Sequence, residues 1–313
     1  MRIRVLGSAA GGGFPQWNCG CDNCLAARRG APGVVPRTQE SIAITADPPG
    51  DGESWFLINA SPEIRAQIES FPGLWPRSAR HSPIAGILMS NGDLDHCLGL
   101  LSLRESQPLV VYATAAMRAG FTEGNVLFRT LQRFPGQLEW RTLRLGAETP
   151  LGAATAPGVA ESPLRVTAVP SPGKLPLHLE GLRTPTPEDN VGFVISDQRT
   201  GRRLAYFSGV AGPSPEIQRA AEEADVLFFD GTFWTSDELI AAGLGTRRAE
   251  EMAHWPISGA GGSLDFLARA AASRRILIHV NNTNPILRDD SEPRRILAAR
   301  GIEVASDGME LSV

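Results

Sequence analysis

The hydrophobic positions of this chain form short runs that end at glycine or polar residues along its whole length. Short runs rich in β-branched and aromatic residues, separated by such breaks, are typical of β-strands. The pattern predicts strands at Arg2–Leu6, Ser41–Ala46, Trp55–Asn59, Ile84–Met89, Leu109–Ala113, Arg141–Leu145, Arg165–Val169, Val191–Ile195, Arg203–Phe207, Val226–Phe229, Arg275–Val280, Ile302–Val304 and Met309–Val313. The segments 146–162 and 170–189 are rich in glycine, proline and threonine and predict long loops.

Segments with helical spacing lie between these strands. Ser61-Pro62-Glu63 is typical of a helix start, with Ser61 as the N-cap, and predicts a helix to about Phe71. Further helices are predicted after His96 and at Ala115–Phe134, Pro215–Ala224, Leu264–Ala272 and Pro293–Arg300, the last of them ending at Gly301. Strands in both halves of the chain, with helices outside them, predict an α/β fold with the layers helix, sheet, sheet, helix.

Composition and charge exclude several classes of function. The chain has 313 residues and a formal net charge of −4, which gives no reason to expect a nucleic-acid partner. Only one of the 30 basic residues is a lysine, Lys174, and Leu175 follows it, so there is no phosphate-binding Walker loop. No apolar run is long enough to span a membrane and no leader segment is evident, so we expect a cytoplasmic protein without membrane insertion.

Three of the four cysteines lie within one short segment, at Cys19, Cys21 and Cys24. Loops this short are strained as disulfides, whereas three thiolates can occupy three corners of a zinc tetrahedron. The sequence therefore predicts a structural Zn²⁺ in the loop 19–24, with a fourth ligand from elsewhere. The alternative is three reduced thiols. Cys97 lies among leucines and is expected to be a core residue.

Two further segments carry candidate metal ligands. Asp95 and His96 follow the predicted strand Ile84–Met89 and could both bind a metal, with Asn91 and Asp93 assisting. The alternative for this segment is a polar turn with an N-capping aspartate. His279 lies near the end of the apolar strand Arg275–Val280, where it is either a ligand or a core histidine bonded to a backbone carbonyl.

Together these motifs resemble the metallo-β-lactamase superfamily, whose signature His-x-His-x-Asp-His lies in such a turn. More closely, the chain resembles the PqqB family of pyrroloquinoline quinone (PQQ) biosynthesis proteins. The resemblance is carried by the segments 5–24, 37–44, 59–68, 93–105, 230–239, 243–262 and 278–287. It implies one domain, residues 1–313, folded as a four-layer αβ/βα sandwich of two mixed β-sheets flanked by helices.

The chain departs from the hydrolase signature at one of its two metal positions. Asn91 and Asp93 replace the two leading histidines, no histidine lies at 171–173, and Ser208 or Gly209 stands where the bridging aspartate should be. The ligands of the other position remain: Asp95, His96 and His279. Two histidines and one carboxylate form the ligand set of mononuclear non-haem iron oxygenases, which predicts Fe²⁺ here. Asp93 is an additional candidate ligand, a proton acceptor or a solvated turn residue.

The resemblance implies an O₂-using hydroxylase that acts on the tyrosine ring of the crosslinked Glu–Tyr precursor of PQQ, with Asp93, Asp95, His96 and His279 as catalytic residues. Other PQQ biosynthesis proteins and a further copy of the chain are candidate partners. The alternatives are a carrier of PQQ or its precursor to the periplasm and a metal-dependent hydrolase.

Five more residues have candidate roles at these sites. His254 is a fourth zinc ligand, a base beside the substrate or a core residue, and Asn282 is the other candidate for the fourth zinc ligand. Asp230 could orient a ligand histidine. Arg104 or Arg247 could bind substrate carboxylates.

Overall fold

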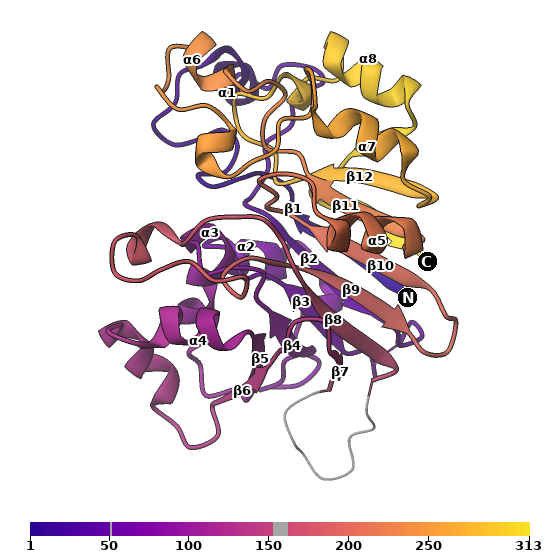
Figure 1. Cartoon of the computed structure of the whole chain (residues 1–313). Helices are drawn as coiled ribbons and strands as arrows, with labels where there is room; N and C mark the ends of the chain where they lie inside the picture. Colours follow the sequence, from indigo (N-terminus) through magenta and orange to yellow (C-terminus); the bar gives the residue numbers. More distant parts are fainter. Residues whose placement is uncertain (51, 153–161) are drawn as a thin grey trace.

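The computed structural model describes residues 1–50, 52–152 and 162–313, so part of the predicted loop 146–162 lies outside the described residues. Its strands form two sheets of seven, in the orders β14-β1-β2-β3-β4-β5-β6 and β13-β12-β11-β10-β9-β8-β7 (Figure 1). The strands are β1 Arg2–Gly7, β2 Ser41–Thr45, β3 Trp55–Ile58, β4 Ile84–Leu88, β5 Leu109–Ala113, β6 Leu138–Thr142, β7 Glu148–Pro150, β8 Leu164–Pro170, β9 Val191–Asp197, β10 Arg203–Phe207, β11 Val226–Asp230, β12 Arg274–Ile278, β13 Ile302–Val304 and β14 Glu310–Ser312.

Both sheets mix parallel and antiparallel pairs. In the first, β14, β1, β2 and β3 are antiparallel neighbours, while β3, β4, β5 and β6 are parallel. In the second, β10 to β13 are parallel, and β7 to β10 are antiparallel. The predicted four-layer fold of two mixed sheets flanked by helices is confirmed.

The core lies mainly between the two sheets, because alternate side chains of each strand point to opposite faces. In β11, Phe228 belongs to the cluster shared with the first sheet, whereas Leu227 and Phe229 belong to a second cluster with Ile217 and Leu267 from the covering helices. Strands that are covered on both faces have continuous apolar sequences. Strands β4 and β11 are of this kind, since all five residues of each are buried.

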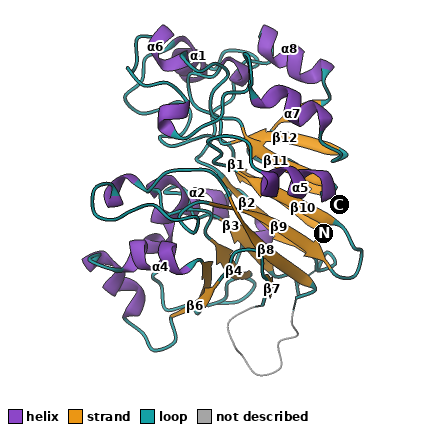
Figure 2. Cartoon of the chain, viewed as in Figure 1, coloured by secondary structure: helices purple, strands orange, loops and turns teal. Residues whose placement is uncertain are grey.

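Helices flank the sheets and also lie among the loops beyond the strands (Figure 2). They are α1 Asp22–Arg28, α2 Ile64–Glu69, α3 Leu94–Cys97, α4 Ala115–Thr122, α5 Pro215–Glu223, α6 Glu238–Ala241, α7 Ser263–Arg269 and α8 Glu292–Ala299. Gly301 follows α8 with a φ of 64°, as a left-handed helix stop requires. No helix in the described ranges combines the length and the apolar character needed to cross a membrane.

Several predicted boundaries were wrong for local reasons. The helix expected at Ala115–Phe134 is α4 followed by a 3-10 segment, Val126–Gln132, because Gly124 has a φ of 69° and Asn125 caps the second segment. Ser61 does not act as an N-cap, since its buried Oγ has no hydrogen-bond partner among the described residues and α2 begins at Ile64. Strand β6 lies three residues earlier than expected, where Leu138 pairs with Leu109 of β5.

The carboxyl ends of central strands meet at one edge of the sandwich. Strand β4 leads into α3, and His279 directly follows β12. Ala9, just after β1, forms parallel bridges with both Gln39 and Val280, which ties the two sheets together at this edge. Side chains that leave these strand ends therefore converge.

Candidate metal centre

The structure brings Asp95, His96 and His279 together. The Oδ2 atom of Asp95 lies 3.2 Å from Nε2 of His279 and 3.5 Å from Nε2 of His96. The two imidazole rings stack with their centroids 5.1 Å apart, and one candidate ligand atom from each residue lies within 4.8 Å of the others. Both histidines are buried. This arrangement could hold one cation through a carboxylate oxygen and two imidazole nitrogens.

A buried carboxylate orients the His96 ring. Oε2 of Glu40 lies 3.1 Å from Nδ1 of His96 and accepts a hydrogen bond from Nδ2 of Asn59 at 2.8 Å. The Asn59 amide also lies 2.7 Å from the same ring nitrogen, and Asn59 has a φ of 62°, a left-handed conformation that asparagine tolerates. Nδ1 of His96 therefore faces Glu40 and Asn59, and Nε2 faces Asp95.

A hydroxyl relay orients the His279 ring. Thr232 Oγ1 lies 2.8 Å from Nδ1 of His279 and donates to Oδ1 of Asp230 at 2.6 Å. The imidazole therefore donates from Nδ1 to the threonine and keeps Nε2 free for a cation. His279 has a φ of 59°, which is uncommon for a residue other than glycine and is typical of functional sites held by their surroundings. Asp230 thus supports the ring of His279, a candidate ligand, and it acts through Thr232.

The electrostatics of the metal-free site favour protonated His96. Burial opposes protonation, but the carboxylates of Asp95 and Glu40 outweigh it and raise the pKa of His96 to about 9. Burial likewise opposes ionisation of Asp95, but the neighbouring imidazoles hold its pKa well below the usual range. A cation that binds here must displace the His96 proton.

Metal binding is therefore expected to depend on pH. Between pH 6.5 and 9, affinity should rise roughly tenfold per pH unit and binding should release about one proton. Folding raises the pKa of His96, so protonated His96 contributes to the free energy of unfolding of the metal-free protein. This contribution is fully present below pH 6.5 and is lost as the pH rises through 9. The metal-free protein should therefore be less stable at pH 9 than at pH 7. Calorimetric titration in two buffers with different ionisation enthalpies measures the released proton, and a pH-independent affinity would contradict the expectation.

Amide groups occupy the position where the hydrolase signature would place a second metal. Nδ2 of Asn91 lies 3.4 Å from Oδ1 of Asn190, and Nδ2 of Asn190 donates to the carbonyl of Gly209 at 2.9 Å. A Cβ atom at Gly173 would lie 2.4 Å from Nδ2 of Asn190, so no histidine side chain fits there without displacing Asn190. The ligands are missing from the sequence, and the space that they would need is filled by this network.

Asp93 lies at the same cavity but outside the ligand cluster. Its Oδ1 accepts a hydrogen bond from the Leu177 backbone at 3.3 Å, and its side chain makes no capping bond to α3. The group of candidate ligands within reach of one ion contains Asp95, His96 and His279 without it. Asp93 therefore connects the loop after β8 to the segment that carries the candidate ligands Asp95 and His96.

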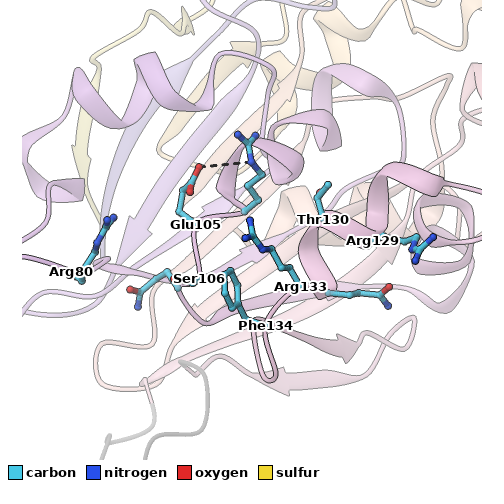
Figure 3. Close-up of a pocket in the computed structure, with 10 residues that line it drawn as sticks. Arg80, Glu105, Ser106, Arg129, Thr130, Arg133 and Phe134 are labelled. Atoms are coloured by element: carbon cyan, nitrogen blue, oxygen red, sulfur yellow. Dashed lines mark ion pairs between the residues drawn. The ribbon is translucent and has the colours of Figure 1, made fainter.

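A cavity of about 470 Å³ opens above the three ligands. Leu94, Leu177, Phe233 and Met252 give it an apolar wall, and Lys174 and Arg247 line it as cations. Arg104, the other candidate for binding carboxylates, lies instead in a different cavity of about 810 Å³ with Arg80, Arg129 and Arg133 (Figure 3). Of the two predicted arginines, only Arg247 lines the metal cleft, because Arg104 follows the 3-10 segment Leu98–Leu103, which leads away from the ligands.

His254 lies in the cleft and not in the cysteine cluster. Its Nδ1 is 2.7 Å from Oδ2 of Asp230, and its ring stacks on His279 with centroids 5.4 Å apart. Asp230, His254 and His279 could also meet at one cation. His254 is therefore excluded as a fourth ligand of the cysteine loop, since its imidazole is committed to Asp230 beside the first site.

The three cysteines surround a side-chain amide. The sulfur atoms of Cys19, Cys21 and Cys24 lie within 4.8 Å of one another, and the Asn282 amide lies 3.1, 3.7 and 3.4 Å from them, respectively. Nitrogen and oxygen of such an amide are assigned from hydrogen bonding, so rotation by 180° would present its oxygen to an ion. Of the two candidates for the fourth ligand, the structure places Asn282 at the cluster. Cys97 is buried in the core, away from it.

Ionisation of the thiols differs across this cluster. Burial opposes ionisation of Cys19, but hydrogen bonds from Cys21, Cys24 and Asn282 lower the pKa of its thiol. Burial raises the pKa of Cys24 to about 11. A bound cation would favour the thiolate form of all three. Because Nδ2 of Asn23 donates to the carbonyls of Asn282 and Asn284, the loop is also tied to the segment that follows His279.

Three supporting residues were missed by sequence reasoning: Glu40, Asn59 and Thr232. Each lies within a segment that carried the family resemblance, and Glu40 directly precedes a buried strand. A carboxylate directly before an apolar run indicates a buried group of opposite charge nearby. The sequence does not show which group, because His96 is remote from Glu40 in the chain.

Replacing Glu40 by glutamine should weaken metal binding without removing a ligand. The amide still fills the space but loses the charge that holds the Nδ1 proton of His96, so we expect a 10- to 100-fold loss of affinity. Competition with a chelator measures it. Glu63→Gln is the matched control, because Glu63 bonds to Gln39 and not to a ligand histidine. Equal affinities for the two variants would contradict the role of Glu40.

Comparison with known proteins agrees with this geometry. A model of the beta-lactamase superfamily domain matches residues 54–280. Coenzyme PQQ synthesis protein B of Azotobacter vinelandii is 44% identical, with 100% of both chains covered. The crystal structure of Zn²⁺-bound PqqB from Methylobacterium extorquens is 42% identical with a TM-score of 0.90, again over 100% of both chains. A diphosphatase of the PhnP family, 20% identical with a TM-score of 0.65 over 100% of this chain and 97% of its own, shares the fold. The chain belongs to the coenzyme PQQ synthesis protein B family, within the β-lactamase superfamily.

Proposed function

We propose that this chain is an iron-dependent oxygenase of PQQ biosynthesis that hydroxylates the tyrosine ring of the crosslinked Glu–Tyr precursor. Its family supports the role in PQQ biosynthesis. The observation that carries the oxygenase assignment is the set of two histidines and one carboxylate formed by Asp95, His96 and His279, beside a position where Asn91 and Asn190 replace the ligands of a second metal. Hydrolases of this fold use two ions to hold and activate water, and this sequence has no histidine at the signature positions of the second ion, 91, 93 and 171–173.

The ligand residues fit Fe²⁺. Both Nε2 atoms and Oδ2 of Asp95 converge from one side, the supporting hydrogen bonds leave the Nε2 lone pairs free, and the other side faces the cavity. In such a site, iron supplies open coordination positions for O₂ and substrate together.

The chain itself binds and orients the substrate. Leu94, Leu177 and Phe233 offer an apolar wall on which an aromatic ring can pack and displace water. His254 holds a proton on Nδ1 towards Asp230, so its Nε2 can accept a proton at the cavity. Burial opposes ionisation of Asp230, but its bonds and the neighbouring imidazoles lower its pKa, so it remains a carboxylate acceptor for that proton.

We propose Zn²⁺ as the ion of the cysteine loop, held by Cys19, Cys21 and Cys24 with Asn282 as the fourth ligand. Thiolates suit Zn²⁺, and the Methylobacterium extorquens relative has been crystallised in a Zn²⁺-bound form. The role is structural, because three sulfurs and an amide leave no open position, and the loop braces the segment that follows His279.

The proposed setting is the cytoplasm, with other PQQ biosynthesis proteins supplying the small precursor and receiving the product, and without a nucleic-acid partner. A further copy of the chain is also a candidate partner.

Oxygen uptake on the precursor tests the function. Each hydroxylation should place one atom of O₂ in the ring and reduce the other to water, with two electrons from added ascorbate and two protons. Protein purified under nitrogen and loaded with Fe²⁺ should consume O₂ only with the precursor, and ¹⁸O₂ should label the product. Turnover with Zn²⁺ under nitrogen would indicate a hydrolase. Tight PQQ binding without O₂ uptake, with normal PQQ output from a His96→Ala strain, would indicate a carrier.

A further inference from the structure

The one lysine of the chain lies at the cleft that holds the candidate metal ligands. Lys174 follows β8 and lines the cavity of about 470 Å³ from one loop, and Arg247 lines it from the loop after α6. Apart from histidines, they are the only basic residues among the described residues that line this cavity. Two cations from separate loops therefore face the space in which a substrate would bind.

Neither cation is paired with a buried carboxylate among the described residues. Arg247 forms no ion pair or hydrogen bond within the part of the chain that the structure describes. Nζ of Lys174 lies 3.9 Å from Oε1 of Glu180, whose side chain is half exposed. By contrast, Arg183 in the same loop pairs with buried Asp189 through both of its terminal nitrogens. The loop thus contains one arginine held by a buried carboxylate and one lysine whose ion-pair partner is half exposed, so that a ligand can compete for the lysine.

The charge balance of the cleft favours an anionic ligand. Its lining includes two carboxylates, Asp93 and Asp95, and Asp95 is itself a candidate metal ligand. Once a divalent cation is bound, positive charges exceed these carboxylates by two, with the histidines neutral. A low-dielectric cleft with such an excess attracts and orients anions.

Apolar surface lines the same cavity as the two cations. Leu94 and Leu177 are 57% and 70% exposed, which is unusual for leucine, and both line the cavity with Phe233. A ring that packs on them would remove this surface from water. The cleft therefore combines an apolar wall with two separate positive groups.

We propose that Lys174 and Arg247 each bind one carboxylate of an aromatic substrate that carries at least two. The inference rests on the proposed function for the identity of that substrate, but it concerns recognition and not chemistry. Lys174 acts as a compact point charge, whereas Arg247 can bind a carboxylate through two parallel N–H groups. A substrate with its carboxylates blocked should lose both contacts and keep only the packing of its ring.

Calorimetric binding to zinc-loaded protein under nitrogen tests recognition without turnover. The probes are the crosslinked Glu–Tyr precursor, its methyl ester with all carboxylates blocked, and PQQ. Lys174→Ala and Arg247→Ala should each weaken binding of the precursor about 10- to 100-fold, and Lys174→Arg should restore it to within about threefold. The affinity of the wild type for the ester should be no higher than the affinity of the double variant, Lys174→Ala with Arg247→Ala, for the precursor. With iron and O₂, KM should rise by similar factors while kcat changes less than threefold.

Arg129→Ala is the matched control, because Arg129 is an exposed guanidinium in the separate cavity of Figure 3. It should bind all probes as the wild type does. An equal loss in the control, an ester that binds as tightly as the precursor, or failure of both the precursor and PQQ to bind below about 1 mM would overturn the inference. Circular dichroism and zinc content show whether each variant is folded.

The two proposals fail in different ways. If the precursor binds with the expected dependence on Lys174 and Arg247 but no O₂ is consumed, the hydroxylase assignment is wrong and the recognition site stands. If O₂ uptake proceeds and both variants keep the wild-type KM, the hydroxylase assignment stands and the recognition site is wrong.

Discussion

Replacing His279 by alanine should abolish metal binding at the cleft and, with it, PQQ formation in cells, while the fold remains intact. The variant removes one of two imidazole ligands, and the remaining pair, Asp95 and His96, cannot hold an ion in competition with the cellular chelators. We expect product formation to fall by at least about 10³-fold, and His96→Ala to behave in the same way. Metal analysis after anaerobic purification and PQQ output of a complemented strain measure the two effects.

The fold should survive because His279 lies at a strand end and contributes little to the apolar core. Its positive φ adds a small strain with alanine, which is well below the stability of a domain of this size. His81→Ala is the matched control, since His81 lies outside the cleft and accepts a hydrogen bond only from the Arg77 backbone among the described residues. Normal PQQ output from His279→Ala would contradict the catalytic role of His279. Loss of output from both His279→Ala and His81→Ala would indicate a general effect of removing a histidine.

Replacing Cys21 by serine should lower both zinc content and thermal stability. A serine hydroxyl does not replace a thiolate on Zn²⁺, and a bound structural ion stabilises the folded state by several kcal/mol. We expect the melting temperature to fall on the order of 10 °C, with less than a fifth of the zinc retained. Because Asn23 bonds to the segment after His279, metal affinity at the cleft should fall as well, by a smaller factor.

Cys97→Ala is the matched control for this variant. Cys97 is also buried, but it packs in the core, and its sulfur contacts the Gly92 carbonyl. It should keep the zinc and lose only the stability that a small core cavity costs, about 1 kcal/mol. Zinc content in Cys21→Ser equal to that of Cys97→Ala would place the zinc somewhere other than the cysteine loop.

The fold was predictable because its strands are short and buried. Strands β5, β10 and β13 have the bounds that the apolar runs predicted, and most of the other predicted strands differ by one or two residues. Predictions failed where pairing or backbone geometry mattered more than hydrophobicity. Strand β7 was missed, since Glu148–Pro150 has no apolar run and is defined only by its pairing with β8.

The sequence indicated the candidate ligands of the site but not the residues that surround them. Asp95, His96 and His279 carry unusual chemistry for strand ends, and Asp95 and His96 are adjacent in the chain. Glu40 and Thr232 carry no such signal, because each is an ordinary residue until the fold places it beside an imidazole nitrogen. The same holds for His254, whose role depended on whether Asp230 or the cysteine loop lay beside it.

The sequence by itself determined the sandwich of two sheets, the family, the residue types available to metals and the loss of one half of the hydrolase signature. These follow from local patterns: apolar periodicity, turn residues and short motifs. Only the tertiary structure decided that Asn282 and not His254 lies at the cysteines, that Arg247 and not Arg104 faces the cleft, and that Asn190 fills the space of the lost ligands. These contacts join residues that are remote in the chain, so they depend on how the two sheets pack and where their strands end.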